Sequence, residues 1–98
     1  MFVDFNKNKR RYLPVKLKSG LVLQLEEPNM QMLEDLQAIS ETEKITDLTK
    51  AVTSILNKNK QKKKFRYEEV ASMLEVSDMI LLLQAYRQFA IEPANDPN

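Results

Sequence analysis

Two pairs of adjacent carboxylates, Glu26-Glu27 and Glu68-Glu69, are the residues whose type best suits acid–base chemistry. The first pair falls at the end of an alternating segment, so its side chains point to opposite faces of a strand. The second falls in the first turn of an expected helix, where glutamate complements the helix dipole. Both pairs therefore have a structural explanation.

The composition removes the usual partners of such carboxylates. The chain of 98 residues contains no histidine and no cysteine, which excludes the commonest general base and any thiolate nucleophile or zinc site. Its single glycine cannot form a phosphate-binding loop. We therefore expect no enzymatic activity, no metal or cofactor, and no catalytic residue.

A basic run is the second candidate for chemistry. Phe65 and Tyr67 lie beside it and could stack on bases, as aromatic residues do in proteins that bind single-stranded nucleic acids. The other interpretation is a solvated loop that keeps a small protein soluble, with Phe65 and Tyr67 as core anchors. We favour the loop because the run lies in a connector, whereas proteins that bind single-stranded nucleic acids carry such aromatic residues on a sheet. The basic residues are Lys58, Lys60, Lys62, Lys63, Lys64 and Arg66.

A short turn at Gly20 separates two segments in which apolar and polar residues alternate. Leu13, Val15 and Leu17 share one face before the turn, and leucines 21, 23 and 25 share one face after it. This pattern predicts a two-stranded antiparallel hairpin from Tyr12 to Glu26. Pro14 near its start indicates that the first strand has one unpaired edge. We expect the leucine face to be covered by the stripe Leu33, Leu36 and Ile39 of the next helix.

The remainder of the chain predicts helices. Asn29 is a suitable N-cap for the first helix, Ser40 or Thr42 for a second, and Ser77 for the last, which would run from Asp78 to Glu92. A short helix over residues 67–74 precedes it. Together with the hairpin, this predicts an α+β, mainly α fold with three to four helices.

The last helix has more apolar residues than one buried face requires, since residues 79–83 are all large and apolar. We expect this excess to form a surface for a partner or for self-association, together with the open edge of the hairpin. The predicted surface consists of Met79, Leu82, Leu83, Tyr86 and Phe89.

Length and hydropathy predict one domain in a cytoplasmic setting. Residues 1–11 read as a flexible lead-in, residues 12–92 as a single domain that includes the loop 57–66, and residues 93–98 as a flexible tail. No apolar run approaches the length of a membrane span, and the N-terminus lacks the pattern of a signal peptide. We expect no association with membranes.

The order of elements resembles that of the small tail assembly chaperones of long-tailed, siphovirus-like bacteriophages and of prophages in Gram-positive bacteria. The matching positions are the Ser19-Gly20 turn, Pro28 before the first helix, the Glu68-Glu69 pair, and the Asp78, Tyr86 and Phe89 positions of the last helix. The resemblance implies a non-enzymatic role in tail morphogenesis in the host cytoplasm. Its implied partners are the tape-measure protein, which such chaperones keep soluble, and the tail-tube protein that replaces them.

Physical reasoning adds self-association to this expectation. A chaperone for a long helical client gains avidity when weakly binding copies repeat along that client, which predicts a homo-oligomer in rings or helical arrays. Two other functions stay open. One is a small nucleic-acid-binding regulator that uses Lys58 to Arg66, and the other is a generic helical interaction subunit.

Overall fold

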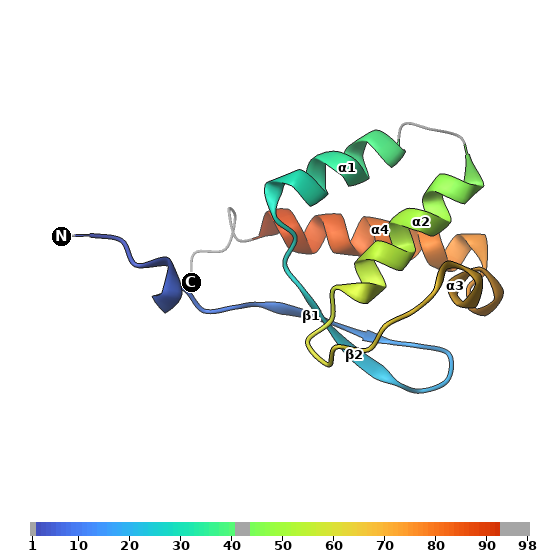
Figure 1. The fold of residues 1–98 in the computed structure, drawn as a ribbon, viewed down its shortest axis with the longest axis horizontal. Helices are drawn as coiled ribbons and strands as arrows, with labels where there is room; N and C mark the ends of the chain where they lie inside the picture. The colour runs from blue at the N-terminus through green and yellow to red at the C-terminus, as the bar shows by residue number, and fades with distance from the viewer. Residues whose placement is uncertain (1, 41–43, 93–98) are drawn as a thin grey trace.

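The computed structural model describes residues 2–40 and 44–92, which form a two-stranded antiparallel sheet followed by four α-helices (Figure 1). The predicted α+β, mainly α fold is confirmed. No helix within these ranges is both long and apolar enough to cross a bilayer. The elements are the 3-10 turn η1 (Phe5–Lys7), β1 (Tyr12–Lys16), β2 (Val22–Glu26), α1 (Met30–Ser40), α2 (Ile45–Asn57), α3 (Tyr67–Met73) and α4 (Val76–Ile91).

The hairpin has the predicted turn, and its pairing brings the predicted apolar faces together. Leu13 pairs with Leu25 and Val15 with Leu23, so these four apolar side chains share the face that is turned toward the helices. The amide of Gly20 donates to the carbonyl of Leu17 at 2.8 Å and closes the turn. Gly20 has a φ of +94°, a conformation that side chains with a Cβ rarely adopt. The only glycine in the chain is therefore at the position that needs it.

The basic loop after α2 completes the sheet, which the sequence did not indicate. The Glu26 amide donates to the Lys58 carbonyl, and the Lys60 amide donates to the Gln24 carbonyl, both at 2.8 Å. Asn59 forms an isolated antiparallel bridge with Leu25 between these two bonds. The outer edge of β2 is thus occupied by residues 58–60. Within the described residues, the edge that stays open is that of β1.

The core lies between the hairpin and the helices. Leu23 and Leu25 of β2 are fully buried, as are Val52 and Ile55 of α2 and Tyr86 of α4. The Tyr86 hydroxyl donates to the Glu26 carbonyl at 2.6 Å and ties α4 to the end of β2. These residues join strand, helix and loop into a single core.

The predicted cover of the hairpin is corrected by the structure. α1 packs on α2, with Leu36 buried and Ile39 half-buried, and it lies on the side of the molecule away from the hairpin (Figure 1). The leucine face of the hairpin is covered instead by residues of α2 and α4. The reason is spatial, because α2 and α4 fill the space between α1 and the sheet.

The predicted helix caps agree with the structure at α1 but not at α4. The Asn29 side chain accepts the Met32 amide at 2.9 Å, as predicted for α1. α4 begins earlier than expected, at Val76, where the Asp78 carboxylate accepts the Glu75 amide at 2.8 Å. Ser77 is therefore inside the helix and not its cap. For α2, Lys44 occupies the cap position without a side-chain bond, Thr42 lies outside the described residues, and the Ser40 side chain is not described.

One arginine connects the segment before the hairpin to the end of the last helix. Arg11 donates to the Glu27 carboxylate and to the Phe89 carbonyl, both at 2.7 Å, and its guanidinium lies 4.5 Å from the centre of the Phe89 ring. In contrast, the side chains of Phe2 and Phe5 are exposed. The lead-in is anchored at Arg11 and extends from the body before it (Figure 1). The tail, residues 93–98, lies outside the described residues.

Candidate functional site

The five α4 residues predicted to form a partner surface lie in the core. Tyr86 has no exposed surface, and the other four side chains are at most 8% exposed. As a correction, these residues do not form an exposed apolar face for a partner, and of the five only Leu82 lines the surface groove described below. The core needs this side of α4 because the helix packs against both α2 and the hairpin. The buried residues are Met79, Leu82, Leu83, Tyr86 and Phe89.

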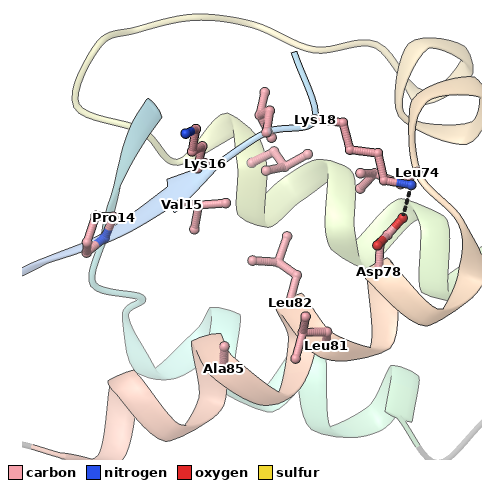
Figure 2. A pocket seen from close by; sticks show the side chains of 11 residues that line it. Pro14, Val15, Lys16, Lys18, Leu74, Asp78, Leu81, Leu82 and Ala85 are labelled. Carbon is pink, nitrogen blue, oxygen red and sulfur yellow. Dashed lines mark ion pairs between the residues drawn. The ribbon is translucent and has the colours of Figure 1, made fainter. Parts of the chain in front are cut away.

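An apolar groove between β1 and α4 is the surface that the structure offers instead, and we call it the β1–α4 groove (Figure 2). It has a volume of about 250 Å³. Leu82 forms part of its wall and points from α4 toward Val15 of β1, while Leu81 stands at its edge and is 66% exposed (Figure 2). Its apolar lining comprises Pro14, Val15, Leu17, Leu56, Leu74, Leu81, Leu82 and Ala85.

A salt bridge closes one end of the groove. The Lys18 ammonium lies 2.7 Å from the Asp78 carboxylate and 3.7 Å from that of Glu75. The hydrogen bond from Lys18 lowers the pKa of Asp78, and the same bond raises the pKa of Lys18. Both groups are therefore charged at neutral pH, so the groove has an apolar floor and one polar end (Figure 2). This layout suits an apolar side chain that projects from a polar backbone or helix.

The open edge of β1 borders this groove and is blunted by a proline. Leu17 bonds to Leu21, so the alternation along β1 turns the backbone groups of Tyr12, Pro14 and Lys16 outward. Pro14 has no N–H, and it breaks the row of donors that an added strand would need. The predicted unpaired edge of the first strand is confirmed, yet it is a poor template for strand addition. The groove favours side-chain docking over backbone pairing.

Sequence reasoning missed Leu81 and Ala85, which are exposed and line the groove from α4. Because residues 79–83 are all apolar, their types do not show which of them face the core and which face solvent. Polar positions carry the missing signal, since Ser77, Gln84 and Gln88 recur at helical spacing and are exposed. Leu81 lies four residues after Ser77, about one helical turn, and hence on the solvent-exposed side of the helix.

The predicted nucleic-acid residues form an ordered loop. The Asn59 side chain is buried, donates to the carbonyls of Leu56 and Lys63, and accepts the Lys63 amide. Asn57 exchanges two hydrogen bonds with the Phe65 backbone. Lys58 is half-buried. The other basic residues of the loop are exposed, namely Lys60, Lys62, Lys63, Lys64 and Arg66.

The aromatic residues beside this loop do not form a platform for bases. Phe65 is buried in the core, as its interpretation as an anchor predicted, and Tyr67 is half-buried at the start of α3. Lys60 lies over the ring of Tyr12, with its ammonium 5.0 Å from the ring centre. The buried ring of Phe65 is therefore not available for stacking on nucleic-acid bases.

Three of the four paired carboxylates have structural partners. Glu26 and Glu27 bind Arg10 and Arg11 at 3.3 and 2.7 Å. The Glu69 side chain accepts the Arg66 amide at the start of α3. Comparisons of the chain with models of protein families, with curated proteins and with solved structures found no match.

Proposed function

We propose that this chain is a non-enzymatic tail assembly chaperone that binds and solubilises the tape-measure protein during tail morphogenesis. Its order of elements supports this proposal through the resemblance described above. The observation that carries the mechanism is the β1–α4 groove, an apolar surface beside a strand edge that proline has blunted. Because that edge lacks a donor, the groove suits the apolar side chains of a helical client better than an added strand.

The size of the groove fits weak and repeated binding. A volume of about 250 Å³ falls below the roughly 300–1,000 Å³ of small-molecule sites. Burial of one large apolar side chain contributes about 1.5–3 kcal/mol, which is too little for stable binding by one copy. Many copies along one long client hold it by avidity. The tail-tube protein is the second partner that this function implies.

Co-expression with the tape-measure protein tests the groove. We expect that protein to stay soluble with the wild-type chain and to precipitate with the Leu81→Asp variant, because a carboxylate at the edge of the groove opposes apolar docking. Ile45→Asp is the matched control, since Ile45 on α2 is 59% exposed and lies outside the groove. A Leu81→Asp variant that is folded and solubilises the tape-measure protein as well as the wild type contradicts the proposal.

A further inference from the structure

The small net charge conceals a strong separation of charge within the chain. Residues 1–27 and 58–66 carry twelve positive and three negative charges, whereas residues 28–57 and 67–92 carry three positive and ten negative charges. The first set contains the hairpin and the loop that completes the sheet, and the second set contains the four α-helices. The first set is therefore net basic, and the helical set is net acidic.

The hairpin and residues 58–60 share an outer face, opposite to the face that packs on the helices. Asn59 points inward at the bridge with Leu25, so its neighbours Lys58 and Lys60 point outward. Lys16 and Val22 are paired and exposed on the same face of the hairpin. Lys16 and Lys60 form no ion pair within the described residues. We call Tyr12, Lys16, Val22, Lys58 and Lys60 the outer sheet face.

The outward side of α1 has the complementary chemistry. Glu34 and Asp35 are exposed, and α1 carries no basic residue. Beside them is an open hollow of about 370 Å³, and Met30 at its rim is 68% exposed. We call Met30, Leu33, Glu34, Asp35 and Ala38 the outer α1 face. It lies on the side of the molecule away from the hairpin (Figure 1).

We propose that the outer α1 face of one copy docks on the outer sheet face of a second copy. Carboxylates of α1 then meet lysines of the sheet, while Met30 and the hollow meet Val22. The two faces lie on opposite sides of the same chain, so the contact is head-to-tail and each copy keeps one face free for the next. The result is an array built by one repeated contact.

This inference specifies how copies of the proposed chaperone associate. It rests on the proposed function only for the role of the array, which is to bind a long client. The β1–α4 groove and the outer sheet face share Lys16, but the apolar lining of the groove lies outside the contact. The purified chain without a client therefore tests the contact by itself. Failure of this test leaves the Leu81→Asp experiment unaffected.

Sedimentation velocity of the full chain is the first test. We expect concentration-dependent association in about 0.05 M NaCl and its loss in about 0.5 M NaCl, because salt screens exposed charges within a few ångströms at high concentration. A wild-type chain that stays monomeric in low salt overturns the proposal. Association that disappears on nuclease treatment assigns the basic face to a nucleic acid, and it also overturns the proposal.

Charge reversal then identifies the two faces. We expect Glu34→Lys/Asp35→Lys and Lys16→Glu/Lys60→Glu each to weaken association at least about tenfold. An equimolar mixture of the two variants should associate again, since each supplies the charge that the other has lost. Lys44→Glu/Lys50→Glu is the control for the lysine variant, with the same change in net charge, and we expect it to associate like the wild type.

The reversed residues are exposed, and circular dichroism checks that each variant is folded. If a reversed variant unfolds, Glu34→Gln/Asp35→Asn and Lys16→Gln/Lys60→Gln replace it, with the same expected loss of association. Folded variants that associate like the wild type, or reversed variants whose mixture stays monomeric, show that these faces are not in contact and overturn the proposal.

Discussion

Removal of one hydroxyl group tests the link between α4 and the sheet. Tyr86 has no exposed surface, and its hydroxyl donates to the Glu26 carbonyl at 2.6 Å. Tyr86→Phe keeps the ring and its packing but leaves that part-buried carbonyl without this donor. A lost hydrogen bond contributes about 1 kcal/mol, and an unsatisfied buried acceptor costs about 1–3 kcal/mol. We expect a loss of about 1.5 kcal/mol in the free energy of unfolding, which lowers Tm by roughly 6–12 °C in a domain of this size.

Alkaline pH adds a second signature of the same contact. Burial raises the pKa of Tyr86 well above its usual value of 10, and the charges of Glu26 and Glu27 raise it further. The neutral hydroxyl therefore contributes stability that is fully present below pH 10 and is lost as pH rises above 10, where the unfolded chain ionises first. The advantage of the wild type over Tyr86→Phe should shrink by up to about 1.4 kcal/mol per pH unit in that range.

Urea denaturation followed by circular dichroism measures both effects. The control is Tyr67→Phe, which removes the hydroxyl of a half-buried tyrosine for which the structure shows no hydroxyl bond among the described residues. We expect it to change the free energy of unfolding by less than about 0.5 kcal/mol. A Tyr86→Phe variant as stable as the wild type at neutral pH, or a difference that is constant to high pH, refutes the reasoning.

Two further substitutions test the loop and the groove. Asn59→Ala removes three hydrogen bonds of a buried side chain, so we expect a loss of about 2–4 kcal/mol in the free energy of unfolding, measured by urea denaturation. The control Gln61→Ala, on the exposed part of the loop, should cost far less. Equal losses in the two variants would contradict the role of Asn59. Asp78→Asn removes the Lys18 pair, and since the pKa of Asp78 is lowered in the fold, the stability that this carboxylate contributes is present above its unfolded pKa near 4 and is lost as pH falls through its folded pKa. Denaturation curves of the wild type and Asp78→Asn should therefore converge in acid, and a gap that persists to pH 2 would contradict this assignment.

Local patterns of sequence predicted the local parts of the fold. Alternation, Pro14 and Gly20 define the hairpin because strand period and turn geometry depend on adjacent residues. Asn29 was found as a cap for the same reason. The start of α4 was predicted two residues late, because Ser77 is a good cap by type while the Glu75 amide is satisfied by Asp78.

The candidate site depended on contacts that no local pattern shows. Residues 58–60 have neither alternation nor β-branched residues, and their pairing with β2 is held by backbone bonds and by the buried side chain of Asn59. The apolar run of α4 left its buried side undecided until its neighbours were known. The choice of Tyr86 and Phe89 as a surface was wrong for that reason, and Leu81 was missed.

Residues 58–60, which pair with β2, lie far along the chain from it, and this separation has a consequence for folding. The Gln24 amide is bonded to the side chain of Gln61, which lies 37 residues later in the chain, and the Tyr86 hydroxyl bonds to Glu26 across 60 residues. The hairpin can form early as a local unit, but its second strand is not enclosed until α2 and α4 are in place. Sheet and helices must then unfold in one cooperative transition, so hydrogen exchange at the Glu26 amide, which is bonded to the Lys58 carbonyl, should report the global stability of the chain.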